Sequence, residues 1–332
     1  MKTHVADFFE KLDSGLIRCH LCPHNCVISP NSRGTCGVRV NRDDVLITEI
    51  YGHLTALAMD PVEKKPLYHF RPGGRILSIG TKGCNMKCPY CQNWHISQDA
   101  SARTTYHDPG EIVTMALGEG SMGIAYTYSE PIIWYEYVRD TAVLAEEKGL
   151  ANVLVTNGFI NPEPLEKLLG YVDAMNIDLK SFRDETYRKV QKARLAPVLE
   201  TITTAHRRGV HIELTTLIVT GINDDMAEMR DIIEFIASLD PGIPWHISRY
   251  YPNYEYHAPQ TDLEFMERVH VEASGKLRFV YSGNVPSSSV GQDTLCPSCG
   301  ATAIRRTGYH VRIEGLEGSA CSSCGFDLGI VR

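Results

Sequence analysis

The chain has 332 residues, of which 43% are hydrophobic, 8% aromatic and 22% charged, so it can form one large domain with appendages or two domains. Its 33 basic and 40 acidic side chains give a formal charge of −7, which argues against nucleic acid as the main partner. The amino-terminal stretch lacks the apolar run of a signal peptide, and no run approaches the ~18 apolar residues of a membrane span. We therefore expect a cytoplasmic protein with no membrane contact.

The 11 cysteines fall into three tight groups, with none left over. In a reducing compartment such cysteines are typical of metal or redox sites rather than disulfides. The groups are Cys19, Cys22, Cys26 and Cys36; then Cys84, Cys88 and Cys91; then Cys296, Cys299, Cys321 and Cys324. They predict a Cys-rich amino-terminal module over residues 1–72, a core over 73–285, and a linker with a Cys-rich module over 286–332.

The amino-terminal group has the spacing C-x2-C-x3-C-x9-C and can hold either Zn²⁺ or an auxiliary [4Fe-4S] cluster. The crowding of its first three cysteines suits a cluster, whereas structural zinc is the more common occupant and is favoured slightly. The run Val38–Tyr51, broken by polar residues 41–44, predicts a β-hairpin in the same module.

The core alternates strand-like and helix-like patterns. Strands are predicted at Arg75–Thr81, Gly123–Tyr128, Ala151–Thr156, Ala174–Leu179, His211–Val219, Trp245–Tyr250 and Leu277–Tyr281. Helices are predicted at Ile132–Lys148, Pro197–Arg208, Met226–Leu239 and Asp262–Ser274. This alternation favours an α/β fold with a parallel sheet, open or barrel-like.

The middle cysteines lie in a loop, Cys84–Cys91, that reads CNMKCPYC and follows the first predicted strand. Their spacing puts three thiolates on one loop, each able to reach a different iron of a cubane cluster, and leaves the fourth iron without a protein ligand. Catalysis is expected at such an open position. A zinc site completed by His95 is the alternative.

With Tyr90 in the aromatic position before the last cysteine, this loop resembles the hallmark of the radical S-adenosylmethionine (SAM) superfamily. The resemblance implies a partial parallel (β/α)6-type barrel and a [4Fe-4S] cluster whose open iron binds SAM. It further implies that an electron from the reduced cluster cleaves SAM to a 5′-deoxyadenosyl radical, which abstracts hydrogen from a substrate. A reductant protein of the flavodoxin or ferredoxin type is the implied partner.

The stretch 128–131 reads YSEP where the superfamily carries a Gly-Gly-Glu-Pro-like turn. The resemblance implies that Glu130, with Ser129 beside it, lies at the methionine ammonium of SAM. The loss of both glycines puts backbone contacts to the cofactor in doubt. Alternatively, Glu130 is an acidic residue at a helix start, favoured there by the helix dipole.

Two further stretches resemble glycyl-radical-enzyme activases, and each ends a predicted strand. Asn157 lies in a TNG sequence, and Asp178 and Lys180 lie in a DLK sequence that is implied to hold the ribose and carboxylate of SAM. A plain surface ion pair is the alternative for the last two. His246 and Arg249, in the run WHISRYYP, are candidates for a substrate or cofactor carboxylate, although a lone histidine on a strand is more often a core residue.

The carboxyl-terminal cysteines form two CxxCG knuckles that resemble a zinc ribbon, after a linker at residues 286–291. Zn²⁺ is the leading occupant and a rubredoxin-like iron site is the alternative. Such a metal would hold together a module too short for a core of its own.

Taken together, these motifs look closest to the radical SAM enzyme of the AmmeMemoRadiSam system, which is related to pyruvate formate-lyase activating enzyme. The substrate is then a protein, as in the activases, or a small molecule processed with Memo-like and Ammecr-like proteins. The alternative function is a non-catalytic zinc-binding adaptor for protein or nucleic acid. An adaptor has no use for a three-thiolate site with an open position.

Overall fold

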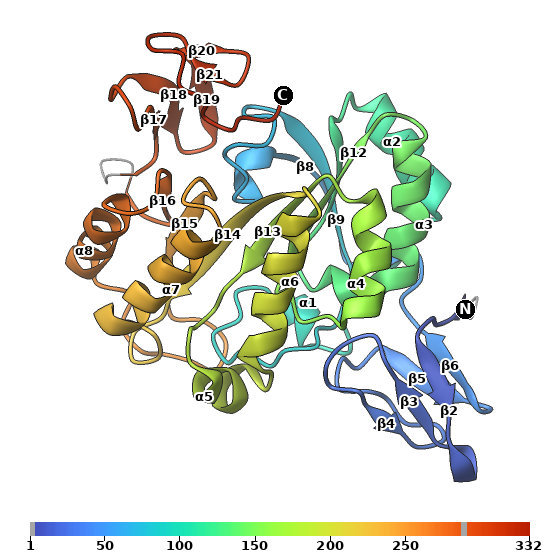
Figure 1. The fold of residues 1–332 in the computed structure, drawn as a ribbon. Coiled ribbons are helices and arrows are strands. Elements are labelled where there is room, and N and C mark those ends of the chain that lie inside the picture. The colour runs from blue at the N-terminus through green and yellow to red at the C-terminus, as the bar shows by residue number, and fades with distance from the viewer. Residues whose placement is uncertain (1–3, 287–290) are drawn as a thin grey trace.

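The computed structural model describes residues 4–286 and 291–332, so most of the predicted linker, residues 287–290, lies outside the described residues. One eight-stranded sheet forms the centre of the molecule (Figure 1). Its spatial order is β16 (Val280–Gly283), β15 (Trp245–Arg249), β14 (His211–Ile218), β13 (Ala174–Asp178), β12 (Ala151–Thr156), β11 (Gly123–Tyr126), β9 (Arg75–Gly80) and β8 (Ala56–Pro61). Neighbouring strands are parallel except β8, which runs antiparallel to β9.

All seven predicted strands of the core are present in this sheet. They read as nearly continuous apolar runs, which is typical of parallel strands covered on both faces. The edge strand β8 escaped prediction because Asp60 and Pro61 gave it a loop-like composition, and an edge is where a sheet tolerates proline. Since β8 precedes residue 73, the sheet begins within the segment that we assigned to the amino-terminal module.

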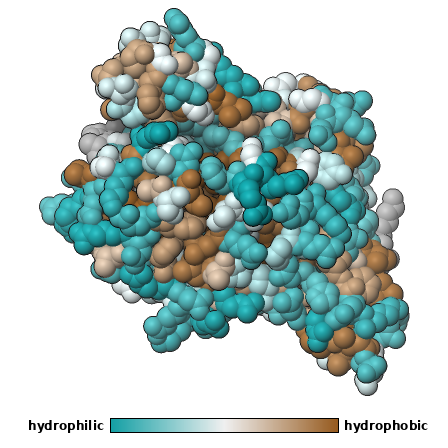
Figure 2. Space-filling model, in the orientation of Figure 1, coloured by the Kyte–Doolittle hydropathy of each residue, from teal (hydrophilic) through white to brown (hydrophobic). Residues whose placement is uncertain are grey.

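Helices follow the parallel strands, and all but the two shortest cover the outer face of the sheet (Figure 1). They are α1 (Trp94–Ser97), α2 (Pro109–Gly118), α3 (Tyr135–Glu146), α4 (Pro162–Leu168), α5 (Asp184–Thr186), α6 (Leu195–Arg207), α7 (Met226–Leu239) and α8 (Leu263–Ser274). The unpredicted α2 begins with a capping box between Asp108 and Glu111. Figure 2 shows this helix-covered face to be largely hydrophilic, as expected for amphipathic helices.

The six strand–helix units from β9 to α8, followed by β16, confirm the predicted (β/α)6-type architecture. Within the described residues, β8 and β16 pair with one neighbour each and not with one another. The barrel is therefore partial, with its two edges apart.

The amino-terminal module consists of short antiparallel strands: β1 (His4–Val5), β2 (Phe9–Lys11), β3 (Ile17–Cys19), β4 (Val27–Ile28), β5 (Arg39–Arg42) and β6 (Val45–Thr48). The pairing of β5 with β6 confirms the predicted hairpin. Next along the chain, β7 (His53–Leu54) pairs with β10 (Thr105–Tyr106). The module rests on α3 through a buried ion pair between Arg39 and Glu136, and on the loop after β12 through Asn161, whose amide donates to the His20 carbonyl (2.6 Å).

The carboxyl-terminal module has strands β17 (Thr294–Leu295), β18 (Thr302–Thr307), β19 (His310–Ile313), β20 (Leu316–Glu317) and β21 (Ala320–Cys321). A bridge between Phe70 and Val331 joins it to the amino end of the sheet. In Figure 1 the two Cys-rich modules accordingly lie at opposite ends of the molecule. No helix in the described part of the chain is long and apolar enough to cross a membrane.

Candidate active site

The three-cysteine loop lies at the carboxyl end of the parallel sheet, directly after β9. Gly83 leads into it at φ 94°, and a Cβ there would come within 2.9 Å of the Cys36 carbonyl oxygen, so only glycine fits without a shift. The fully buried Asn85 donates to the Phe159 carbonyl (2.8 Å), and Lys87 N–H donates to the Gln191 carbonyl (2.9 Å). The loops after β12 and β13 therefore hold the cysteine loop in place.

Tyr90 contributes to the same anchoring. Its side chain is 4% exposed, and its hydroxyl accepts a hydrogen bond from the Gln191 amide (2.8 Å). On the other flank, Glu255 N–H donates to the Pro89 carbonyl (2.9 Å). The structure thus gives the aromatic residue of the motif a buried position that helps to anchor the loop.

All three thiols are free, with Cys88 buried and Cys84 and Cys91 half-buried. Burial raises the pKa of Cys84 well above its usual value, and the nearby Glu130 carboxylate adds to this. Burial raises the pKa of Cys88 to about 11, although the Lys180 ammonium opposes the rise. A bound cation would offset the cost of ionising these buried thiols, because metal ligation deprotonates cysteine.

The spread of the sulfurs indicates the kind of group that fits here. Among the described residues, 4–286 and 291–332, these thiols belong to no set of three Cys, His, Asp or Glu ligand atoms lying within 4.8 Å of one another. A single zinc ion completed by His95 is therefore unsupported. Three separated thiolates on one loop suit a cluster in which each binds a different iron, with one iron left open.

The turn 128–131 is tied to both ends of the cysteine loop. Ser129 Oγ donates to the Thr81 carbonyl (2.6 Å) before the loop, and Asn93 donates to the Tyr128 carbonyl (2.7 Å) after it. Tyr128, which stands where the superfamily has glycine, takes the left-handed conformation at φ 70°. Glycine would adopt this conformation without strain. The turn therefore keeps a glycine-like backbone despite its sequence.

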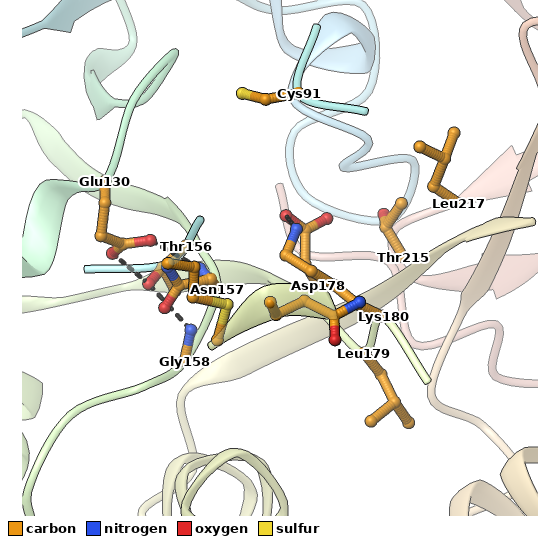
Figure 3. Close-up of polar contacts among 12 residues, drawn as sticks. Cys91, Glu130, Thr156, Asn157, Gly158, Asp178, Leu179, Lys180, Thr215 and Leu217 are labelled. Carbon is orange, nitrogen blue, oxygen red and sulfur yellow. Dashed lines mark hydrogen bonds and ion pairs between the residues drawn. The ribbon is translucent and has the colours of Figure 1, made fainter. Parts of the chain in front are cut away.

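Glu130 is 2% exposed and is bound on both carboxylate oxygens (Figure 3). Oε1 accepts from the Thr156 hydroxyl (2.6 Å) and Ile132 N–H (3.1 Å), and Oε2 accepts from Asn157 N–H (2.8 Å). Burial raises its pKa to about 7, against the opposing effect of these hydrogen bonds. The bond from Ile132 is the helix-start contact expected of such an acid, and the others join two strand ends.

Asn157 connects this carboxylate to the cysteine loop. Its amide donates to the Asn85 side-chain oxygen (2.9 Å) and lies 3.7 Å from the Cys84 sulfur. The sequence did not single out Asn85 or Thr156 as site residues. The sequence features that could have identified them are the position of Asn85 directly after Cys84 and that of Thr156 at the end of a predicted strand.

Asp178 is the last residue of β13, and Lys180 lies two residues after it (Figure 3). Lys180 Nζ is 2.7 Å from the Asp178 carboxylate, and the side chains are 18% and 35% exposed respectively, so this is not a plain surface pair. Burial lowers the pKa of Lys180, but the charges of Asp178 and Cys88 outweigh it and raise the pKa well above its usual value. A fixed positive charge therefore faces Cys88.

The structure places His246 with Glu213 rather than with the thiols. Its Nε2 lies 2.6 Å from the Glu213 carboxylate, which also accepts from Tyr68 N–H (3.0 Å) and His69 N–H (2.7 Å) in the segment before β9. His246 is thus part of the packing toward the amino end of the sheet. This environment agrees with the alternative interpretation of His246 as a core histidine rather than as a contact to a substrate or cofactor carboxylate.

Arg249 lies at the carboxyl end of β15 but faces away from His246, because successive side chains of a strand point to opposite faces. Its Nε donates to the Thr261 carbonyl (2.8 Å), and Nη1 contacts the Tyr251 hydroxyl (3.3 Å). The structure therefore shows Arg249 holding the loop after β15.

The carboxyl-terminal cysteines converge on one point. Cys296 and Cys324 have sulfurs 3.6 Å apart, those of Cys299 and Cys321 are 3.7 Å apart, and all four lie within 4.8 Å of one another. A Zn–S bond of about 2.3 Å gives a tetrahedron with edges of about 3.8 Å, so this set matches a zinc-ribbon-like metal site. The amino-terminal cysteines do not converge in this way.

Comparison with known proteins supports this site. A family model described as the radical SAM superfamily matches residues 78–236, which include the cysteine loop, Glu130, Asn157 and Lys180. An uncharacterized protein of Methanocaldococcus jannaschii is 43% identical over 333 residues, covering 98% of this chain and 99% of that protein. The pyruvate formate-lyase 1-activating enzyme of Escherichia coli K12 is 27% identical over 176 residues, covering 51% of this chain and 70% of that enzyme.

Among solved structures, Streptococcus suis SuiB bound to its precursor peptide SuiA matches with a TM-score of 0.50 at 14% identity, covering 67% of this chain and 51% of SuiB. At this identity the match speaks for the fold alone. It agrees with the partial barrel described above. The chain belongs to the radical SAM superfamily, an enzyme family that implies a [4Fe-4S] cluster and SAM.

Proposed function

We propose that this protein is an activase-like radical SAM enzyme that abstracts hydrogen from a protein substrate. The observation that carries the proposal is the separated, three-thiolate set Cys84, Cys88 and Cys91 at the carboxyl end of a barrel whose edges stay apart. Similarity to pyruvate formate-lyase 1-activating enzyme supports the activase assignment. An open edge leaves room for a polypeptide segment to enter.

In this proposal the three thiolates hold the [4Fe-4S] cluster, and the buried Tyr90 anchors the loop that carries them. Bound there and reduced by a flavodoxin- or ferredoxin-type protein, the cluster and SAM together supply a 5′-deoxyadenosyl radical. Lys180 and Asp178 offer a cation and an anion to the carboxylate and ribose of SAM. Glu130 fixes the Asn157 backbone, and its Oε2 has one hydrogen-bond position left for the methionine ammonium.

The finer assignments also belong to this proposal. Membership of the AmmeMemoRadiSam subfamily, with Memo-like and Ammecr-like partners, is supported by the combination of the YSEP turn and the four-cysteine amino terminus. Zn²⁺ in the ribbon is supported by its sulfur spacing. A cytoplasmic location is supported by the free state of all 11 cysteines.

The chemistry is tested by anaerobic incubation of the reconstituted protein with SAM and dithionite, followed by quantification of 5′-deoxyadenosine. We expect the wild type and the surface variant Val271→Ala to form it and Cys88→Ala to form none. Equal formation by Cys88→Ala would overturn the cluster assignment.

The substrate class is tested by adding either the soluble protein or the low-mass fraction of an extract from deuterium-grown cells, whose carbon-bound hydrogen is deuterium. Protein substrates predict deuterium in 5′-deoxyadenosine, or a protein-based radical in the electron paramagnetic resonance (EPR) spectrum, with the protein fraction alone. Deuterium transfer from the low-mass fraction alone would contradict the activase assignment and favour the small-molecule alternative.

A further inference from the structure

The four amino-terminal cysteines lie in a module that contacts the cysteine loop of the proposed active site. We propose that Cys19, Cys22, Cys26 and Cys36 hold a second iron–sulfur cluster rather than zinc, and that this cluster passes electrons to the cluster at Cys84. The metal assignment stands on these residues alone. The electron route rests on the proposed function.

The spacing of the four sulfurs does not match a single ion. Within the described residues no three of these thiols lie within 4.8 Å of one another, unlike the ribbon, whose sulfur pairs are 3.6 and 3.7 Å apart. A cubane separates its thiolates because each binds a different iron, whereas zinc draws four into one small tetrahedron.

The site is lined with hydrogen-bond donors for charged sulfur. Arg39 Nη1 lies 3.7 Å from the Cys19 sulfur, and Thr35 N–H donates to the Cys26 sulfur (3.4 Å). Donors to sulfur and a buried positive charge stabilise the added electron of a reduced cluster, and they are among the means by which proteins set cluster potentials.

This site lies directly against the cysteine loop of the proposed active site. His24 Nε2 is 2.7 Å from the Asn85 carbonyl oxygen, one residue after Cys84. The Cys36 carbonyl oxygen lies 2.9 Å from the place that a Cβ on Gly83 would occupy, one residue before Cys84. The peptides that carry the two cysteine sets are therefore in contact.

The opposite side of the site faces solvent. Cys26 is half-buried, and the next residue, Val27, is 51% exposed. A one-electron carrier protein can therefore reduce the second cluster at this side. The reduced cluster then loses one electron to the oxidised cluster at Cys84, with no bond made or broken and no proton moved. Zinc has no accessible redox state and cannot carry this step.

The first test isolates the second site. A triple variant, Cys84→Ala with Cys88→Ala and Cys91→Ala, is reconstituted anaerobically with iron, sulfide and zinc, and its metals are counted. We expect about four irons and about one zinc per chain, and an EPR signal after reduction that does not respond to SAM. No iron with about two zincs would overturn the proposal.

Matched single substitutions complete the test. Cys26→Ala should lose about four irons and keep the SAM-responsive signal, whereas Cys299→Ala should lose only zinc. In the fully reduced wild type we expect the two signals to broaden one another. A wild-type EPR spectrum equal to the sum of the spectra of the triple variant and Cys26→Ala would overturn the electron route.

The wild-type protein decides the question if the variants do not fold. About eight irons with one zinc supports the second cluster, and about four irons with two zincs contradicts it. Eight irons without 5′-deoxyadenosine would refute the proposed function and leave the second cluster in place. About four irons together with 5′-deoxyadenosine would support the proposed function and refute the second cluster.

Discussion

Glu130 offers a sharp test of the site because its carboxylate is buried, ionisable and hydrogen-bonded on both oxygens. Glu130→Gln keeps the shape and a carbonyl that can accept from Thr156 and Ile132 N–H, but it turns an amide N–H toward Asn157 N–H. The loss of this acceptor lowers the free energy of unfolding by about 1–3 kcal/mol. Glu130→Ala leaves two buried backbone N–H groups without an acceptor and should cost about 2–6 kcal/mol.

The hydrogen bonds of Glu130 stabilise the folded protein, whereas its buried negative charge destabilises it. Its pKa in the folded protein is about 7, above the unfolded value of 4.5, so the folded state prefers the protonated acid. Its contribution to stability is therefore complete below pH 4.5 and is lost as the pH rises through 7, with a total of about 3 kcal/mol. About 2 kcal/mol of this falls between pH 5.5 and pH 8. Glutamine does not titrate and removes this dependence.

Anaerobic urea unfolding of wild type and Glu130→Gln at pH 5.5 and pH 8 measures both effects. We expect the variant to be clearly less stable than the wild type at pH 5.5, with the gap closing by about 2 kcal/mol at pH 8. If the gap is the same at both pH values, Glu130 does not carry a raised pKa, and the argument from its burial is wrong.

Three further predictions concern the surroundings of the site. Glu136→Ala leaves Arg39 buried and unpaired and should lower the free energy of unfolding in urea by about 3–5 kcal/mol. Glu49→Ala breaks more exposed ion pairs and should lower it by less than about 1 kcal/mol. Equal losses in the two variants would contradict the role of the buried pair. Lys180→Met should weaken SAM binding about tenfold or more in an equilibrium binding assay. Lys189→Met, at an exposed helix position, should leave the affinity for SAM unchanged. Unchanged affinity in Lys180→Met would remove Lys180 from the cofactor site. Chelation of the ribbon metal should lower the thermal midpoint of the ribbon without releasing iron, and iron loss in step with zinc would show that the sites are not independent.

The sequence predicted the parallel sheet because its strands are apolar runs separated by helical periodicity. It also predicted the cysteine loop, since three ligands at close spacing need no tertiary information. It missed the edge strand β8, which ends in Asp60 and Pro61, and the short helix α2, which begins with a capping box.

Local sequence could not supply the long-range pairing inside the site. The partners of Glu130 and Asn157 come from loops that meet only in the folded sheet, and Asn85 was visible merely as a neighbour of Cys84. The same limitation explains His246, whose motif suggested a cofactor contact, while the fold brought Glu213 to it from a neighbouring strand. The spacing of sulfurs in the two outer cysteine sets likewise depends on tertiary structure.

The central claim is that the loop of Cys84, Cys88 and Cys91 leaves one iron open to SAM. It is tested most directly by electron–nuclear double resonance on the reduced protein with SAM labelled with ¹⁷O in its carboxylate and ¹⁵N in its amino group. We expect hyperfine coupling of both labels to the cluster in the wild type, and none in Cys88→Ala. An EPR spectrum of the wild type that SAM leaves unchanged, with no coupling to either label, would contradict it.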